Sequence, residues 1–322
     1  MKTKTASVCV SACWLCFAAP VLAQSYPSKP VTILVPTSPG TTHDVISRLL
    51  APMLAQKLGQ PFIVENRPGA SGNIGTAAVA KASPDGHTLL VTGSTLTMTP
   101  YFYKDLPYNP VADLAPVGTL YKVTMTLAVH PSVPATSVSE FIAHVRSRPG
   151  QLNYGSPGNG TPHHLMMELL KQQVQLFIVH IPYKGTADAV TGMLSGSVEA
   201  GFMNLLPALP LAKAHKIRIL SISGSKRSML APEVPTFHEA KIEELDTDPW
   251  IALFAPGRTP AHIIVRLNRE VMPLMDHPNV KEVLRNQGLD AFTGTPEQLG
   301  ELVRTELARW QRVVTQAGIK PD

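Results

Sequence analysis

The order of short apolar runs and helical patterns in the first third of the chain most restricts its fold. Strands are predicted at 31–35 (VTILV), 62–65 (FIVE) and 87–92 (HTLLVT). The first is apolar and β-branched throughout, which is typical of a strand buried on both faces of a parallel sheet. Between the strands, apolar residues at helical spacing predict helices over 44–58 and 73–82. This β-α-β-α-β order predicts an α/β fold.

The same alternation continues beyond residue 120. Strands are predicted in TMTLAVH, QLNYGS, LFIVHIPY, VEAGF and IRILSIS, and helices over 163–173, 187–196 and about 296–317. No linker composition marks a domain boundary. We therefore expect two α/β domains joined by strand-like crossings, which we place near Leu127 and near Trp250.

The first 23 residues have the pattern of a secretory signal peptide. Lys2 and Lys4 precede an apolar stretch that runs from about Val8 to Ala19, and VLA closes the segment at Ala23. The apolar stretch is shorter than the roughly 20 residues that span a bilayer. We therefore predict cleavage after Ala23 and an exported, soluble mature protein.

The cysteines narrow the possible chemistry. Cys9, Cys13 and Cys16 all lie within the predicted signal peptide, so the mature chain would contain none. This excludes disulfides, zinc–thiolate sites and cysteine nucleophiles. Without Lys2 and Lys4 the formal net charge of +5 becomes +3, and no basic run with interleaved aromatics favours nucleic-acid binding.

Four loops that follow a predicted strand and precede a predicted helix could hold a ligand. They cover 37–44 (TSPGTTHD), 66–75 (NRPGASGNIG), 92–97 (TGSTLT) and 153–165 (NYGSPGNGTPHHL). In open α/β sheets, ligands collect where strand C-terminal ends meet helix N-termini, and the free backbone N–H groups there favour anions. Each loop also has a purely structural interpretation, as a turn that permits tight packing and helix capping.

The fourth loop has the chemistry that best suits an anion. Gly155, Gly158 and Gly160 would let the backbone approach a ligand closely. Thr161 would then cap a helix that starts at Pro162.

Histidines beside these loops form no recognisable catalytic or metal pattern. Asp44 is a natural N-cap, and His43 next to it could be either a proton-transfer partner or a pocket-lining side chain. His163 and His164 are adjacent, so on a helix they would point about 100° apart and make a poor metal pair. No G-x-S-x-G elbow or P-loop is present, and no G-x-G-x-x-G follows the first strand. We expect no metal, no cofactor and no catalysis.

Together these loops resemble those of the Bug (TctC-like) extracytoplasmic solute-binding receptors of tripartite tricarboxylate transporters. The resemblance covers essentially the whole chain after residue 23. It rests on YPSKPVTILVP, GQPFIVENRPGASGNIG, PDGHTLL, LPYNPVADLAPV, LNYGSPGNGTPHHL, PYKG, NLLPALP and LFAPGRTP, in this order. It implies a two-domain periplasmic-binding-protein fold (type II-like), with a ligand cleft between domain 1 (24–126 and 251–322) and domain 2 (127–250).

The resemblance also implies a function and a set of contacts. A monomeric receptor would capture a small carboxylate in the cleft and deliver it to membrane permease subunits. An alternative is a ligand-sensing partner of a membrane sensor kinase; an enzyme that uses His43 is the third interpretation. In relatives the first and fourth loops bind the carboxylate. Ligand contacts are expected from Ser38, Pro39, Gly40, Thr41, Thr42, His43, Ser71, Ser94, Ser156, Asn159, Gly160, Thr161 and Asn204.

Two of the places where the chain departs from this family's pattern bear on the ligand. Relatives commonly have A-P-G-G-G-[ST]-D where this chain has SPGTTHD, so Thr41 and Thr42 replace two glycines. Either the loop takes another path, or those glycines served close approach and the threonines narrow the pocket and add hydroxyls. Met203 stands where relatives commonly have Asp before the pocket Asn204, which should disfavour amino-bearing ligands. We therefore expect a mono- or dicarboxylate without an amino group, bound mainly by hydrogen bonds.

Overall fold

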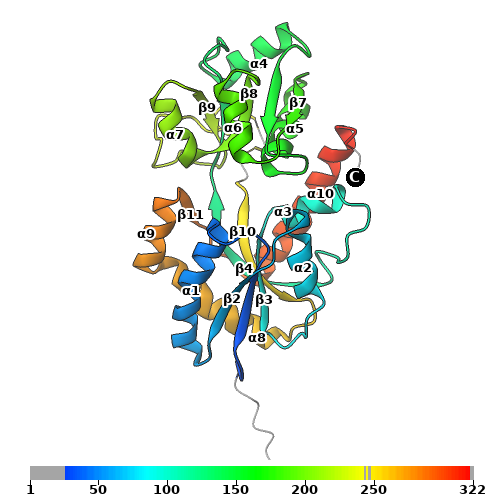
Figure 1. Ribbon diagram of the computed structural model, residues 1–322, viewed down its shortest axis with the longest axis vertical. Coiled ribbons are helices and arrows are strands. Elements are labelled where there is room, and N and C mark those ends of the chain that lie inside the picture. The colour runs from blue at the N-terminus through cyan, green and yellow to red at the C-terminus, as the bar shows by residue number, and fades with distance from the viewer. Residues whose placement is uncertain (1–25, 243, 246–247, 320–322) are drawn as a thin grey trace, which may run out of the picture.

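The computed structural model describes residues 26–242, 244–245 and 248–319, which form two α/β halves arranged one above the other (Figure 1). The predicted signal peptide, residues 1–23, lies outside the described residues. What we call the six-stranded half has one mixed sheet. Its strand order is β11 (Leu289–Ala291), β4 (Leu114–Val123), β10 (Trp250–Pro256), β3 (Thr88–Gly93), β1 (Val31–Val35) and β2 (Phe62–Asn66).

Helices cover both faces of this sheet because its strands are apolar on both sides. Val31, Ile33 and Val35 of β1 lie in one buried cluster, whereas Leu34 lies in the cluster on the opposite face. The first cluster is closed by α1 (Thr42–Leu58), α8 (Ala261–Val271) and α9 (Pro278–Asn286), and the second by α2 (Asn73–Ala80) and α10 (Pro296–Gln316). Shorter helical segments are α3 (Thr95–Met98) and the 3-10 turns Ala70–Gly72, Thr99–Tyr101 and Met272–Asp276.

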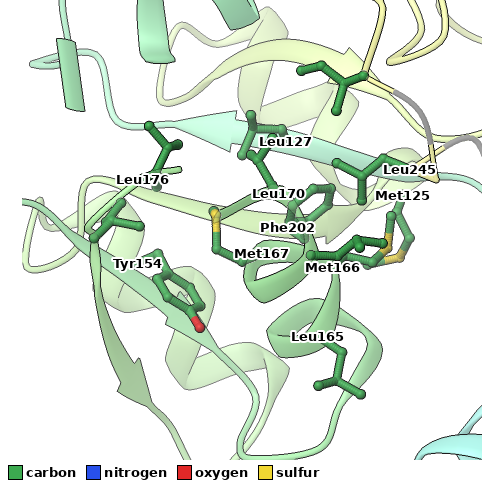
Figure 2. Close-up of a cluster of buried hydrophobic side chains, with 14 of the residues drawn as sticks. Met125, Leu127, Tyr154, Leu165, Met166, Met167, Leu170, Leu176, Phe202 and Leu245 are labelled. Carbon is green, nitrogen blue, oxygen red and sulfur yellow. The ribbon is translucent and has the colours of Figure 1, made fainter. Parts of the chain in front are cut away.

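What we call the five-stranded half is built in the same way. Its strand order is β7 (Val179–Pro182), β6 (Asn153–Ser156), β8 (Ala200–Asn204), β5 (Met125–Val129) and β9 (Arg218–Ile222). One face packs on α4 (Val138–Ser147) and α5 (Pro162–Val174), and the other on α6 (Thr186–Leu194) and α7 (Leu205–Lys213). Figure 2 shows how Leu165, Met166, Met167 and Leu170 of α5 fill the first of these cores.

The chain passes between the halves twice. It leaves the six-stranded sheet at the end of β4 and enters β5 after Thr124, and it returns through the segment between β9 and β10. The two passages lie side by side, because the N–H of Val123 donates to the carbonyl of Pro249 at 2.8 Å. The predicted crossings near Leu127 and Trp250 lie close to them, while the domain boundaries themselves stay a prediction.

Helix α10 is a third connection between the halves. Its first turns, with Leu299 and Val303, pack in the cluster with α2, whereas Trp310 and Val313 pack in the core of the five-stranded half. Gln172 Nε2 on α5 donates to the carbonyl of Val313 at 2.6 Å. Figure 1 shows α10 rising from the lower half to the upper one.

The predicted helix starts have different outcomes. The capping box of Thr295 with Gln298 is confirmed, and the Thr161 hydroxyl caps α5 by accepting the N–H of His164. Asp44 as an N-cap is wrong. The cap of α1 is Thr41, and Asp44 lies in the first turn, where its carboxylate accepts the N–H of Gly40 at 2.9 Å.

β4 and α7 are among the elements that were not predicted from the sequence. β4 contains Pro116 and Gly118, and α7 contains Pro207 and Pro210, all of which are typical of loops. In both cases tertiary packing overrides local preference: β4 pairs with β10 and β11, and α7 packs on the five-stranded sheet. The α/β fold class is nevertheless as predicted.

Candidate functional site

A cavity of about 540 Å³ lies between the two halves and is lined by residues of both. The six-stranded half contributes the loops after β1, β2 and β3, and the five-stranded half contributes the loop before α5 and the end of β8. Four of these segments, the one before α5 included, belong to the loops that were predicted to bind a ligand. A second cavity of about 590 Å³ is lined from the five-stranded half alone and receives none of the expected ligand-binding residues.

Most of the expected ligand-binding residues meet at the first cavity. Its lining includes Ser38, Thr41, His43, Ser71, Ser94, Asn159, Gly160, Thr161 and Asn204. Pro39, Gly40, Thr42 and Ser156 are not among the lining residues. For all of the expected residues, contact with a ligand stays a prediction.

Ser156 lies outside the lining, and its hydroxyl is bonded within the loop and to the neighbouring strand β7. Ser156 is fully buried, and its Oγ lies 2.6 Å from Nε2 of His180 and donates to the carbonyl of Gly158 at 3.1 Å. It therefore holds the shape of the fourth loop rather than facing the cavity.

The N-termini of four helices converge on the cavity. The N-cap residues of α1, α2, α5 and α7 are Thr41, Gly72, Thr161 and Asn204, and all four line it. The first N–H groups of a helix have no partner within the helix, and the helix dipole gives its N-terminus partial positive charge. Such an arrangement attracts an anion.

The cavity has no ionised side chain of its own. Among the described residues, those lining it include no Asp, Glu, Lys or Arg; its polar groups are hydroxyls, the amides of Asn159 and Asn204, backbone groups, and the rings of His43 and His163. Apolar contact comes from Val123, Met125 and Trp250, among others. An anion here would be bound by hydrogen bonds and dipoles rather than by a salt bridge.

The threonines of the first loop adopt ordinary backbone conformations. Thr41 has φ −69° and ψ 160°, and Thr42 is the first residue of α1, while the left-handed conformation falls on Gly40 with φ +80°. Replacing glycine by threonine therefore causes no strain at these two positions. Thr41 lines the cavity and Thr42 does not, so the expected narrowing applies to Thr41 alone.

The first and fourth loops share one hydrogen-bonding pattern. Thr41 Oγ1 donates to the carbonyl of Ser38 at 2.9 Å, and Thr161 Oγ1 donates to the carbonyl of Gly158 at 2.8 Å. In each loop, the glycine before the threonine donates its N–H to the side chain four residues later. These two bonds run from Gly40 to Asp44 at 2.9 Å and from Gly160 to His164 at 3.1 Å.

This shared pattern has a sequence signature that the loop-by-loop analysis missed. The segments GTTHD (40–44) and GTPHH (160–164) both fit G-T-x-H. In each, the histidine is the second residue of its helix, and both His43 and His163 line the cavity. Comparing the loops with each other would have identified His163, which was interpreted as part of a helix start.

The two cavity histidines are neutral. Burial lowers the pKa of His43 to about 4, and the ring packs edge-on against Tyr121 with centroids 6.3 Å apart. Burial also lowers the pKa of His163 to about 4. The side chain of Asn204 lies close enough to raise the pKa of His163 slightly against this burial. Neither ring nitrogen of His163 has a partner within hydrogen-bond geometry, however.

His43 and Asp44 do not act as a proton-transfer pair. The Asp44 carboxylate is 3 % exposed and accepts the N–H of Gly40 and the Nε–H of Arg48, both at 2.9 Å. Burial raises the pKa of Asp44, but the hydrogen bonds from Arg48, Gly40 and Asn66 outweigh it, so the net pKa is lowered. The acid holds the first loop and leaves the ring of His43 to face the cavity.

A stack of aromatic rings supports the fourth loop from behind. The rings of His164 and His180 are parallel with centroids 4.0 Å apart, and Tyr154 stacks on His180 at 4.7 Å. Burial lowers the pKa of His164 to about 4 and that of His180 to about 3. His164 thus faces the interior, and the described residues contain no cluster of three or more metal-binding side chains.

Met203 was expected to disfavour amino-bearing ligands by replacing an Asp in the pocket, and this mechanism is wrong. Met203 is 5 % exposed and lies in the buried cluster with Met193, Val198 and Ala208. Successive residues of a strand point to opposite faces, so Asn204 lines the cavity and Met203 does not. A change at position 203 cannot exclude an amino group by direct contact.

Two α/β halves, two passages between them and a cavity lined from both define a two-domain periplasmic solute-binding fold. The chain belongs to the receptors of tripartite tricarboxylate transporters, since the model of the "Tripartite tricarboxylate transporter family receptor" matches residues 46–319. In the described part of the chain, no helix has the length and apolar character needed to cross a membrane.

Similar proteins cover almost the whole chain. Protein BugT of Bordetella pertussis (strain Tohama I) is 37 % identical over 305 residues, which are 94 % of each chain. An R. palustris protein solved with adipate is 34 % identical with a TM-score of 0.76, covering 92 % of this chain and 100 % of that one. MatC from Rhodopseudomonas palustris with bound malate is 32 % identical with a TM-score of 0.70, covering 90 % and 100 %.

Proposed function

We propose that this protein is a periplasmic receptor that captures a small carboxylate in the cavity between its halves. The observation that carries the proposal is the convergence of four helix N-termini on a cavity lined by no ionised side chain. Unpaired N–H groups and helix dipoles would bind the carboxylate oxygens. The relatives solved with adipate and with malate support the same ligand class.

The apolar part of the lining favours a ligand with a hydrocarbon body. Val123, Met125, Trp250 and Ile251 line the same cavity as the helix N-termini. Burial of such a body would contribute about 25 cal/mol for each Å² of apolar surface removed from water. We therefore expect mono- and dicarboxylates, with binding by hydrogen bonds at the charged groups.

Calorimetry with a panel of organic acids tests the proposal. The panel includes malate, adipate, shorter and longer dicarboxylates, and aliphatic and aromatic monocarboxylates, and adipamide serves as a matched uncharged control for adipate. At least one acid should bind and raise the melting temperature, because ligand bound to the native state stabilises it. Its diamide or ester should bind far more weakly. Failure of every acid, or equal binding of acid and diamide, would overturn the proposal.

The receptor would act as a monomer, release its ligand unchanged and deliver it to the permease subunits of a tripartite tricarboxylate transporter. Membership of the receptor family supports this role. The test is uptake of the labelled ligand by cells that contain the permease, with and without this receptor. Uptake that does not depend on the receptor would contradict it, as would chemical conversion of the ligand by the purified protein.

A further inference from the structure

We propose that His43 and His163 determine specificity as a pair, each taking up one proton when a dicarboxylate binds between the first and fourth loops. Capture of the ligand would then be coupled to proton uptake from solvent. The inference rests on the proposed function, because it concerns the same cavity and the same ligand class. It goes further in assigning to two side chains the charge that the cavity otherwise lacks.

The positions of the two histidines carry the inference. Each is the second residue of a helix whose N-cap threonine lines the cavity, and the two helices, α1 and α5, belong to opposite halves. The same pattern of hydrogen bonds from glycine and threonine shapes both loops. A ligand with two carboxylates could place one at each loop, beside one imidazole.

The second step concerns which side chains of the cavity lining can carry a charge. Among the described residues, His43 and His163 are the titratable side chains in it. A dianion transferred from water into this cavity would lose hydration, and helix N-termini would replace part of it. A nearby anion favours the protonated form of histidine, so each imidazole can gain a proton and become the counter-ion of one carboxylate.

The groups around His43 leave it able to take up that proton. Across the ring lie Tyr121 of β4, which is a phenol, and Gly93 of β3, which carries no charge. On its own helix, Asp44 is paired with Arg48 at 2.9 Å. The ring is therefore free of a fixed ion pair, and burial holds its pKa near 4 until an anion arrives.

The groups around His163 have the same character. Asn204 faces it from the end of β8, and His164 on its own helix turns into the interior, where Nδ1 accepts the N–H of Gly160. On the two passages between the halves, Lys122 at the end of β4 and Asp248 before β10 pair with each other at 2.8 Å. Both ring nitrogens of His163 lack a partner, so a ligand can supply one.

The proton balance is simple. Each neutral imidazole plus one proton from solvent gives an imidazolium with charge +1, which offsets one carboxylate of charge −1. The proton-binding constant of each histidine rises when the ligand is bound. Affinity must therefore increase as the pH falls through the pKa of the complex, by at most about tenfold per pH unit for each proton.

The decisive experiment measures proton uptake directly. Malate and adipate are titrated into the protein by calorimetry at about pH 5.5, 6.5 and 7.5, in two buffers that differ in ionisation enthalpy. The protons that the free ligand carries at each pH, given by its own carboxyl pKa values of roughly 4–5, are added to the measured uptake, because a ligand that binds as the dianion releases them. We expect net uptake of up to two protons and tighter binding at the lower pH. Binding without proton uptake overturns this inference and leaves the proposed function standing, whereas no carboxylate binding at any pH overturns both.

Conservative variants separate the two rings. His43→Gln and His163→Gln should each remove about half of the proton uptake, and the double variant should abolish it while still binding the probe. His87→Gln is the matched control, because His87 lies away from the cavity beside Asp85, and it should leave uptake unchanged. Full uptake in the double variant overturns the inference. Melting temperatures measured without ligand show whether each variant folds. If a variant does not fold, the proton uptake of the wild-type protein alone decides whether the inference holds.

Discussion

The backbone N–H of Gly160 donates to Nδ1 of His164 at 3.1 Å, so a neutral imidazole holds the loop that precedes its own helix. Gly160 has φ +72°, and a Cβ there would come within 2.9 Å of the ring of Phe102. The loop conformation therefore depends on a residue without a side chain and on an unprotonated nitrogen. Acid should release it before the core of the protein unfolds.

Replacing His164 should change the pH dependence of stability. Its pKa of about 4 in the folded protein lies below the ordinary value of about 6.5, so the unfolded chain binds a proton first as the pH falls. The stability that the neutral ring contributes is present above pH 6.5 and is lost progressively towards pH 4. His164→Gln should be less stable at pH 7 but lose about 1–2 kcal/mol less between pH 7 and 5. Urea unfolding of both proteins at these pH values checks this, and parallel profiles would contradict it.

Thr161→Ala should weaken both the fourth loop and ligand binding. The hydroxyl accepts the N–H of His164 and donates to the carbonyl of Gly158, and alanine removes both bonds. We expect a loss of about 1 kcal/mol in unfolding free energy and a similar loss in affinity for a bound carboxylate. Thr161→Ser keeps the hydroxyl and is the matched control. Unchanged melting temperature and affinity in the alanine variant would argue against the role of this cap.

Asp44→Ala should be more damaging than Asp44→Asn. Alanine leaves the N–H of Gly40 and the guanidinium of Arg48 without their shared acceptor, whereas asparagine still offers one oxygen. The expected loss for alanine is about 1.5–3 kcal/mol of unfolding free energy. Since the net pKa of Asp44 is lowered, its contribution is present above about pH 4 and is lost at more acidic pH. Equal melting temperatures for the two variants at pH 7 would contradict this.

Glu306 is buried on α10, and its replacement by glutamine should be tolerated. Thr97 has one hydroxyl hydrogen, and Thr97 Oγ1 lies 2.7 Å from the carbonyl of Ser94 and 2.9 Å from Glu306 Oε2. If the threonine donates to the carbonyl, Glu306 must supply the other hydrogen, which agrees with burial raising its pKa.

This neutral carboxyl group gives a pH-dependent prediction. Because the pKa of Glu306 is raised in the folded protein, its favourable contribution is fully present below the unfolded pKa of about 4.5 and is lost as the pH rises. Glu306→Gln should therefore gain stability over the wild type between pH 5 and 8, while Glu306→Ala loses it through a cavity and a lost bond. Melting temperatures across this range provide the test, and a gap between Gln and Glu that shrinks as the pH rises would count against a neutral carboxyl.

The parts of the fold that sequence could predict are those in which local and tertiary preferences agree. Val31–Val35 is apolar on both faces and forms the strand that its composition predicts, and Thr295 with Gln298 forms its capping box. β4 was missed because Pro116 and Gly118 are placed in a strand by pairing on both sides. Local pattern contains no information on such partners.

The site was predictable as a set of loops, but its individual contacts were not. Loops that follow the parallel strands β1 and β3 meet at one edge of the six-stranded sheet, so Thr41 and Ser94 reach the same cavity, and Thr161 reaches it from the other half. The hydrogen-bond partners decide which polar groups remain for a ligand, and those of Ser156 are the carbonyl of Gly158 in its own loop and the ring of His180 on β7. Only three-dimensional proximity shows that.

Beyond Ala23 the sequence contains two tryptophans, Trp250 on β10 and Trp310 on α10. Trp250 lines the cavity, and Trp310 packs from α10 against the core of the five-stranded half. The indole rings are thus positioned to sense both the arrival of a ligand and any rotation of one half against the other. The unlabelled chain contains its own optical reporter: its emission spectrum, excited at wavelengths that tyrosine does not absorb, should shift on titration with a bound acid and stay constant with an amide that does not bind.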